Sequence, residues 1–478
     1  MLELTLDGEG SRQAQLQRAL KGLLLAGHVR RLPGTRALAT RLKLARNTVI
    51  AAYAQLEAEG YVAALPGSGF VARWQAPAMR APQRGEHEAP QLSALARKAL
   101  ELAVRRPPPR RAAGGRERPP RLDLVYGVPL RQPALWRRWR QALAAAVLEI
   151  DPDYPPVAGL PRLRTALAGY LARRRGFQCE AAQIVMTGGA QQALDLCVRT
   201  LATEHTLALL EDPHYQGTRQ VLVAAGVPLR CLPVDADGLD PQALPERRDC
   251  LLFLTPAHQF PRGCQLTLER RLQILAWAAR TGSWVIEDDY DGEFRFDARP
   301  LAALKALDGD ERVVYVGTLS KALFPALRMG FLVLPPVLVE ACAAVKWLSD
   351  RGNAALEQLA LARMIESGAF EHHLRQAGRA LAARRAALLD GLQRHCGERV
   401  TIEGQAAGMH LTAWLQGVPA TALPALLARA AESFDLGLYS IAPYFHVQPA
   451  QAGLLLGYAG LAPADLSEAA VRLARLLA

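Results

Sequence analysis

The sequence lacks the features that would place it in a membrane or outside the cell. Its 478 residues contain no run of about twenty uncharged apolar residues, the length that a helix needs to cross a bilayer. The first residues, MLELTLDGEG, lack the basic segment and apolar core of a secretory signal. We therefore expect a protein that has no membrane partner and works in the cytoplasm.

The cysteines are too few and too scattered to form a disulfide framework. No two of them make a CxxC pair, the common spacing of zinc ligands, and the seven positions are Cys179, Cys197, Cys231, Cys250, Cys264, Cys342 and Cys396. We expect most of them to be buried as small apolar side chains in a reducing compartment. We predict no metal site.

The excess positive charge lies in the first quarter of the chain. Of a net charge of +12, residues 1–73 carry +5 and residues 74–121 carry +7, so the rest of the chain is neutral. A merely soluble basic surface would spread this excess along the chain. A basic segment joined to a neutral body is typical of a protein that binds a polyanion.

Composition divides the chain into three regions. Residues 1–73 show helical periodicity, and residues 74–121 are so rich in Pro, Arg, Ala and Gly that they predict a linker, with one short helix in QLSALARKALELAV. In residues 122–478, apolar runs such as LALLEDP and CLLFLTP alternate with amphipathic stretches. This alternation predicts an α/β domain with a mainly parallel sheet wrapped by helices.

The first region predicts a winged helix-turn-helix. Its helical segments are RQAQLQRALKGLLLA, RALATRL and ARNTVIAAYAQLEAEGY, and the last two are joined by a turn of three residues. The YVAALPGSGFVA segment that follows predicts a hairpin whose tip lies beside the DNA groove. A helix presented in this way enters the major groove with its N-terminal residues at the bases. The candidate DNA-binding residues are Arg36, Arg46, Asn47, Thr48, Gly67 and Ser68.

The string RNTVIAAYAQLEAEGYVAALPGSGFVA resembles the winged helix of the GntR family of regulators over about sixty residues. Two positions depart from the family pattern. Lys43 stands where a turn glycine is usual, and Ala45 stands where a capping serine is common. The loss of that cap costs about 1 kcal/mol. The resemblance implies binding to double-stranded DNA.

The third region contains a lysine between two apolar runs, in VVYVGTLSKALFPALRMGFLV. Lys321 follows a β-type run directly, where an unpaired ammonium would be costly unless its amine has become an imine. The hydroxyls of Thr318 and Ser320 and the guanidinium of Arg328 are suited to hold a phosphate close to it.

Three upstream segments carry complementary groups. WVIEDDYDGEF ends a β-run in carboxylates, at the strand end where open α/β sheets bind ligands, and it includes Asp288 and Tyr290. IVMTGGAQQALDL combines a strand, a Gly-Gly turn and a helix start, which suits a phosphate. Tyr215, in LLEDPHYQG, follows another strand end. Together they suit pyridoxal phosphate, which needs a carboxylate at its ring nitrogen and a donor near its phenolic oxygen.

The order and spacing of these segments resemble fold-type I aminotransferases over residues 122–478. The resemblance makes Lys321 the Schiff-base lysine, Asp288 the partner of the pyridine nitrogen, Tyr290 the partner of the phenolic oxygen and Tyr215 the stacking ring. It assigns the phosphate to Gly189, Ala190, Thr318, Ser320 and Arg328. A GntR-like winged helix joined to such a domain resembles the MocR group, which implies a head-to-tail homodimer.

Two departures bear on catalysis. Aminotransferases usually hold the phenolic oxygen with an Asn, whereas HQFPRG has Phe260 there, so that Gln259 or His258 would have to substitute. The late strand that carries a substrate-binding Arg in the enzymes reads AGLLLGYAG here, with three leucines at 454–456. Without that clamp an α-amino acid would be poorly oriented, unless another arginine serves.

These observations leave three hypotheses. The first is a transcription regulator whose effector is pyridoxal phosphate or an amino compound condensed onto it. The second is a working aminotransferase with a DNA-binding appendage. The third is a regulator that keeps the fold without the cofactor, against which Lys321, Asp288, Tyr290 and Arg328 all argue. We expect the first, and therefore no enzyme.

Overall fold

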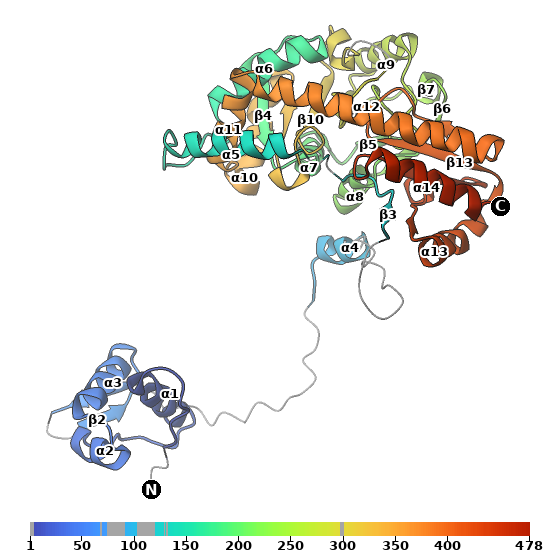
Figure 1. Cartoon of the computed structure of the whole chain (residues 1–478). Coiled ribbons are helices and arrows are strands. Elements are labelled where there is room, and N and C mark those ends of the chain that lie inside the picture. Colours follow the sequence, from blue (N-terminus) through green and yellow to red (C-terminus); the bar gives the residue numbers. More distant parts are fainter. Residues whose placement is uncertain are drawn as a thin grey trace. The chain divides into compact units, whose positions relative to one another are not determined.

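The computed structural model describes residues 4–66, 69–73, 91–102, 120–128, 130, 132–296 and 301–478. The chain divides into two compact units, Met1–Leu92 and Ser93–Ala478, with a boundary inside the predicted linker (Figure 1). Across the described residues, no helix combines the length and apolar character that crossing a membrane requires.

The N-terminal unit is a three-helix bundle with a two-stranded hairpin. Its elements are α1 (Arg12–Leu25), α2 (Thr35–Leu42), α3 (Arg46–Ala58), β1 (Val62–Leu65) and β2 (Gly69–Ala72), the two strands pairing antiparallel. Leu16 and Leu20 of α1 and Val49 and Leu56 of α3 are fully buried in one core, as their helical spacing predicts. The Tyr53 hydroxyl donates to the Pro33 carbonyl oxygen at 2.8 Å and so ties the start of α2 to α3.

The turn between α2 and α3 shows what the two departures from the family pattern cost. Lys43 caps α2 in the left-handed conformation with φ of 53°, which is unfavourable for a residue with a Cβ. Ala45 is the N-cap of α3, and no side chain bonds to the first backbone amides of that helix. Both positions therefore lack the residue type that stabilises them best.

The second unit is built on an eight-stranded sheet in the order β4-β11-β10-β9-β8-β5-β6-β7. Its strands pair parallel from β10 through β9, β8 and β5 to β6, while β11 and β7 run antiparallel to their neighbours. The bounds are β4 (Ile184–Thr187), β5 (Leu207–Asp212), β6 (Leu229–Asp235), β7 (Gly238–Leu239), β8 (Cys250–Leu254), β9 (Trp284–Asp289), β10 (Val313–Thr318) and β11 (Gly330–Val333). The predicted mainly parallel sheet is confirmed.

Helices cover both faces of this sheet (Figure 1). Successive residues of one strand belong to different cores: Leu210 of β5 packs in one and Leu209 in the other, which explains why the strands read as continuous apolar runs. The helices are α5 (Pro133–Val147), α6 (Pro161–Arg175), α7 (Ala190–Leu201), α8 (Gln216–Ala224), α9 (Leu268–Thr281), α10 (Pro336–Asp350) and α11 (Ala355–Glu366).

The C-terminal part adds a smaller antiparallel sheet. It consists of β12 (Val400–Glu403), β13 (His410–Pro419) and β15 (Gln451–Gly457), covered by α12 (Ala369–Cys396), α13 (Leu423–Phe434) and α14 (Pro463–Leu476). β14 (Leu436–Gly437) pairs with β3 (Leu122–Asp123), so the first described strand of the unit is fixed against its C-terminal part.

The linker helix α4 (Ala94–Leu102) lies against α8. The Lys98 amine is 3.4 Å from the Val223 carbonyl oxygen, and the Gln220 side-chain amide donates to the Leu102 carbonyl oxygen at 3.3 Å. The short helix predicted within the linker is therefore present, and it belongs to the second unit.

Candidate cofactor site and DNA-binding surface

A cavity of about 240 Å³ lies where the parallel strands end. Eight of the nine residues predicted to bind the cofactor line it, and the ninth, Gly189, adjoins Arg328, whose guanidinium would be 3.5 Å from a Cβ at that glycine. The described lining consists of Tyr126, Gly127, Ala190, Gln191, Tyr215, Phe260, Asp288, Tyr290, Thr318, Ser320, Lys321, Pro325 and Arg328. Loops that follow β5, β8, β9 and β10 meet there, as expected for an open parallel sheet.

Lys321 reaches this cavity from the loop after β10. Its amine lies 4.4 Å from the centre of the Tyr126 ring, and a Cβ on Gly127 would be 3.3 Å from it. Burial lowers the pKa of Lys321, and the nearby Asp291 opposes that shift. A lowered pKa favours the neutral amine, which is the form that attacks an aldehyde.

Asp288, near the end of β9, is buried and lines the cavity. Its Oδ1 atom has no hydrogen-bond partner among the described residues. Burial raises the pKa of Asp288 to about 7, with further contributions from Asp289, Asp291 and Glu211. An unpartnered carboxylate at this place fits a ligand that brings a positively charged ring nitrogen.

Other groups at the cavity suit an anion. Gly189 is the N-cap of α7 with φ of 113°, a conformation that favours glycine. Ala190 and Gln191, the first two residues of α7, line the cavity, and the start of a helix offers free backbone amides to an anion. Arg328 adopts a left-handed conformation with φ of 51° at the end of its short turn. Together with the hydroxyls of Thr318 and Ser320, these groups fit a phosphate.

Tyr215 is the N-cap of α8 and is partly exposed at the cavity, with its ring centre 6.0 Å from that of Phe260. Phe260 itself lines the cavity at the place where the enzymes have an Asn. The Gln259 amide donates to the Pro213 and Phe260 carbonyl oxygens, and the His258 ring lies beside Tyr290. Neither Gln259 nor His258 lines the cavity among the described residues, so neither takes the direct place of that Asn.

Several lining residues were missed by the sequence analysis, namely Tyr126, Gly127, Gln191 and Pro325. Tyr126 and Gly127 lie just after the linker, outside any helix or strand. The one signal was the glycine itself, which here adopts φ of 88° beside the lysine amine. Gln191 was hidden in an amphipathic helix, where a polar residue usually faces solvent.

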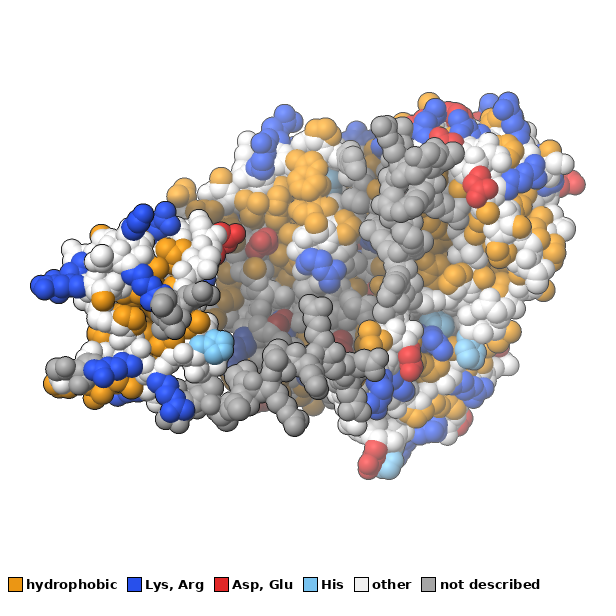
Figure 2. Space-filling view, turned by 90° about the horizontal axis from the view of Figure 1, so that it is seen from below, with side chains coloured by type: hydrophobic (Ala, Val, Ile, Leu, Met, Phe, Trp, Pro, Cys, Tyr) orange, Lys and Arg blue, Asp and Glu red, His pale blue; other side chains and the backbone are white. Residues whose placement is uncertain are grey.

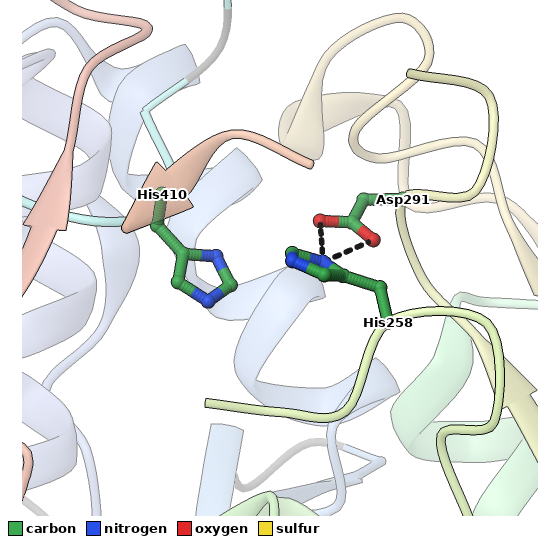
Figure 3. Close-up of side chains that lie close together, drawn as sticks. All are labelled: His258, Asp291 and His410. Atoms are coloured by element: carbon green, nitrogen blue, oxygen red, sulfur yellow. Dashed lines mark hydrogen bonds and ion pairs between the residues drawn. The ribbon is translucent and has the colours of Figure 1, made fainter. Parts of the chain in front are cut away.

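A second group missed from the sequence is His258, Asp291 and His410, which Figure 3 shows pointing toward one another. Their potential ligand atoms lie within 4.8 Å of one another, and all three side chains are buried. The structure thus brings together a group of residue types that can hold a metal ion, where the sequence predicted none. The Nδ1 atom of His258 is 3.1 Å from both carboxylate oxygens of Asp291.

The predicted DNA-binding residues lie mainly on the exposed side of the N-terminal unit. Arg36 on α2 and Arg46 and Asn47 at the start of α3 are exposed, and Thr48 is half-buried. Gly67 and Ser68 lie outside the described residues. Figure 2 shows Lys and Arg side chains around the surface of this unit. Such a surface suits phosphate contacts, with base contacts from the start of α3.

Each of the two units matches a known protein family. The model of the bacterial regulatory proteins of the gntR family matches residues 12–71, and that of aminotransferase class I and II matches residues 132–432. The probable rhizopine catabolism regulatory protein MocR of Rhizobium meliloti is 37% identical over 98% of this chain and 94% of its own length. The pyridoxine biosynthesis transcriptional regulator PdxR of Corynebacterium glutamicum is 32% identical over 78% of this chain and 76% of its own length.

A solved structure is also similar. The α-aminoadipate aminotransferase LysN of Thermus thermophilus, complexed with N-(5'-phosphopyridoxyl)-L-leucine, has a TM-score of 0.66 and 28% sequence identity, and the match covers 74% of this chain and 92% of that chain. A winged helix of GntR type and an aminotransferase-like domain whose cavity combines a lysine, a carboxylate and groups that fit a phosphate define a class of DNA-binding regulators. The chain belongs to the MocR group of this GntR family.

Proposed function

We propose that this transcription regulator binds DNA through its N-terminal unit and that this binding responds to pyridoxal phosphate, or to an amino compound held by it. The observation that carries the proposal is one cavity that joins a half-buried lysine, a buried carboxylate and groups suited to an anion in a chain with a winged helix. The regulatory names of MocR and PdxR, which match 98% and 78% of this chain, support it.

The cofactor is pyridoxal phosphate, which supplies an aldehyde that condenses reversibly with primary amines. Lys321 is the amine that this chain offers, and Asp288 would hold the proton on the ring nitrogen. Arg328, Thr318 and Ser320 would hold the phosphate, together with the amides at the start of α7. Tyr215 would pack against the ring.

The cavity favours the cofactor itself as the signal over an α-amino acid. Arg328 is the one arginine among the described residues that line it, and it lies at the phosphate end. The late strand β15 presents buried Leu454, Leu455 and Leu456, none of which binds a carboxylate. A substrate carboxylate therefore finds no bidentate partner in the described lining.

A second candidate function is transamination, which the match to aminotransferase class I and II favours. Its mark is a half-reaction in which a single amino acid converts bound pyridoxal phosphate to pyridoxamine phosphate, followed by the loss of visible absorbance. An unchanged spectrum across the common amino acids and amines supports a regulator without turnover.

DNA binding by a dimer is part of the same proposal. The GntR-type winged helix suits one half-site, and a head-to-tail homodimer would place two such helices on repeated half-sites. The effector would then change how the linkers present the two helices.

The experiment that tests the proposal is a footprint on the DNA upstream of this protein's own gene, with and without pyridoxal phosphate and with no amine present. Wild type and Lys321→Ala are compared. We expect the cofactor to change the protected pattern in wild type alone. An identical pattern in every lane contradicts the cofactor as signal and directs the search to amines.

A further inference from the structure

Three titratable side chains meet behind the cofactor cavity that the proposed function does not use. His258 comes from the loop after β8, Asp291 from the loop after β9 and His410 from the start of β13. Their exposed fractions are 3%, 1% and 0%. Figure 3 shows the His258 ring lying between the Asp291 carboxylate and the His410 ring.

The contacts of one ring nitrogen, His258 Nδ1, decide which groups donate and which accept hydrogen bonds here. His258 Nδ1 is 3.1 Å from both oxygens of Asp291 and 2.9 Å from the Tyr290 hydroxyl oxygen. An imidazole nitrogen either donates or accepts, and an ionised carboxylate only accepts. Nδ1 therefore carries the hydrogen and donates toward Asp291, which fixes the tautomer of His258.

This tautomer decides what Tyr290 can do. Because Nδ1 has no lone pair to offer, the Tyr290 hydroxyl cannot donate to it, and its hydrogen points elsewhere. In the cluster around Tyr290, the side chains of Phe260 and Leu455 offer no acceptor. Tyr126 and Tyr444 also pack there, and among the described residues the Tyr290 hydroxyl forms no hydrogen bond with either of them. Tyr290 also lines the cofactor cavity, which is where an acceptor can sit.

We infer that Asp291 and His258 are a positioning pair that turns the Tyr290 hydroxyl into the cofactor cavity as a hydrogen-bond donor to the phenolic oxygen of pyridoxal phosphate. The inference rests on the proposed function for the identity of the cofactor. It assigns roles to two residues that take the place of the missing Asn indirectly, through Tyr290.

Close backbone packing holds the pair in this geometry. A Cβ on Gly408 would lie 2.3 Å from His258 Cε1 and 2.4 Å from Asp291 Oδ2, and a Cβ on Gly263 would lie 2.8 Å from His258 Nε2. Two glycines thus allow the main chain to contact the pair from different segments. Gly408 and Gly263 both have positive φ, so a side chain is disfavoured there twice over.

The remaining ring nitrogens leave one alternative. His410 Nε2 is 3.0 Å from the Pro261 carbonyl oxygen and so donates, while His410 Nδ1 and His258 Nε2 have no hydrogen-bond partner among the described residues. A metal ion that joined the two rings would use these lone pairs. We favour the positioning pair because the structure contains its hydrogen bonds, from His258 to Asp291 and Tyr290. The test below includes a search for bound metal.

The test is a pH titration of the visible absorbance of pyridoxal phosphate bound to the full-length protein. The titratable groups that face Tyr290, Lys321 or His410 are Asp288, Asp291, Glu211, Tyr126 and His258. The titrated proton is the one on the imine that would join the cofactor to Lys321, and its loss leaves a full negative charge on the phenolic oxygen. A hydrogen-bond donor at this oxygen stabilises that charge and so lowers the midpoint pH of the titration. Tyr290→Phe removes the donor and should raise this midpoint by about one pH unit.

The decisive variant is Asp291→Asn. An amide does not hold a histidine tautomer, so His258 Nδ1 becomes an acceptor and Tyr290 turns its hydrogen toward it. The midpoint should then rise, as in Tyr290→Phe. A purely through-space charge effect has the opposite sign, because Asp291 raises the pKa of Lys321. A midpoint that stays in place or falls overturns the inference.

Three controls separate positioning from damage. In a Tyr290→Phe background, Asp291→Asn should give no further rise, and in a His258→Phe background the rise should disappear because the competing acceptor is gone. Glu211→Gln, which neutralises a buried carboxylate bonded to Thr255 rather than to His258, should give no rise. A rise of equal size in every background overturns the inference.

Two measurements on the wild type complete the test even if Asp291→Asn fails to fold. The ¹⁵N spectrum of histidine-labelled protein, assigned with His258→Phe, should show a protonated Nδ1 at His258, and an unprotonated Nδ1 overturns the inference. Elemental analysis that finds one metal ion per chain, lost in His258→Phe, also overturns it. A wild type that binds no pyridoxal phosphate fails the proposed function instead and leaves the tautomer measurement standing.

Discussion

At the residue scale, buried carboxylates give the second unit an unusual acid-base character. Burial raises the pKa of Asp288, Glu211 and Glu287 to about 7 in each case. Glu287 is occupied, since it accepts from the Leu304 and Lys305 amides, and Glu211 accepts from Thr255. Asp288 alone of the three has an oxygen without a hydrogen-bond partner among the described residues and faces the cavity. This oxygen is therefore available to a ligand in the cavity.

The raised pKa of Asp288 has a consequence for stability without the cofactor. The folded state keeps a proton that the unfolded state loses above a pH of about 4, so stability falls as pH rises from there to about 7. Asp288→Asn removes this contribution of about 1.4 kcal/mol per pH unit. We expect thermal unfolding of the cofactor-free variant to depend less on pH between 5 and 7 than that of wild type. Parallel curves would show that Asp288 is ionised in the folded protein.

Residue-scale partnerships were the part that the sequence could not provide. Lys321, Asp288 and Tyr290 were predicted because each lies at or just after a strand end and each has a known chemical use. His258, Asp291 and His410 are separated by 33 and 119 positions and share no local pattern. Only the packing of segments far apart in the chain brings them together. The sequence around a buried polar residue does not reveal which distant residue it contacts.

At the scale of elements, α3 begins without a side-chain cap. Ala45→Thr would supply a side-chain oxygen to the first amides of α3, where no cap exists now. We expect a gain of about 1 kcal/mol, seen as slower hydrogen exchange of the α3 amides in the full-length protein. Ala45→Val, which has the same shape without the hydroxyl, should give no such gain. Equal protection in both variants would mean that capping does not limit α3.

The exposed start of α3 also carries the predicted base contacts. Arg46→Ala should weaken binding to the specific site by about tenfold to a hundredfold and relax the preference at one base pair. Arg36→Ala serves as the comparison, since an exposed arginine on α2 is suited to phosphate contacts that weaken binding to all sequences alike. Competition binding against a set of single-base operator variants measures both. Uniform weakening by Arg46→Ala would assign it to phosphate as well.

The elements themselves were largely predictable. Apolar residues spaced three or four apart predicted the helices of the first unit, and continuous apolar runs predicted β5, β8, β9 and β10. What could not be predicted was the order of those strands, or that β11 would run antiparallel between β4 and β10. Strand order depends on contacts between residues far apart in the chain, which hydrophobic period does not encode.

At the scale of the whole molecule, the linker both connects the two units and carries positive charge that can contact DNA. Residues 105–118 hold six arginines in a region that the sequence predicts to be a linker. Replacing all six with glutamine should flatten the dependence of DNA affinity on salt, because fewer counterions are released. Titrations at several salt concentrations on specific and non-specific DNA measure the slope. An unchanged slope would limit the phosphate contacts to the first unit.

The contact of α4 with α8 divides the linker into two stretches in which insertions should have different effects. Residues 74–93 connect the two units, whereas residues 103–119 begin and end within the second unit, since α4 and β3 both belong to it. In the proposed homodimer, insertions in the first stretch should alter the allowed distance between operator half-sites, and insertions in the second should leave it unchanged. Relatives with linkers of different length should therefore have operators whose spacing varies with the stretch before α4 and is indifferent to the stretch after it.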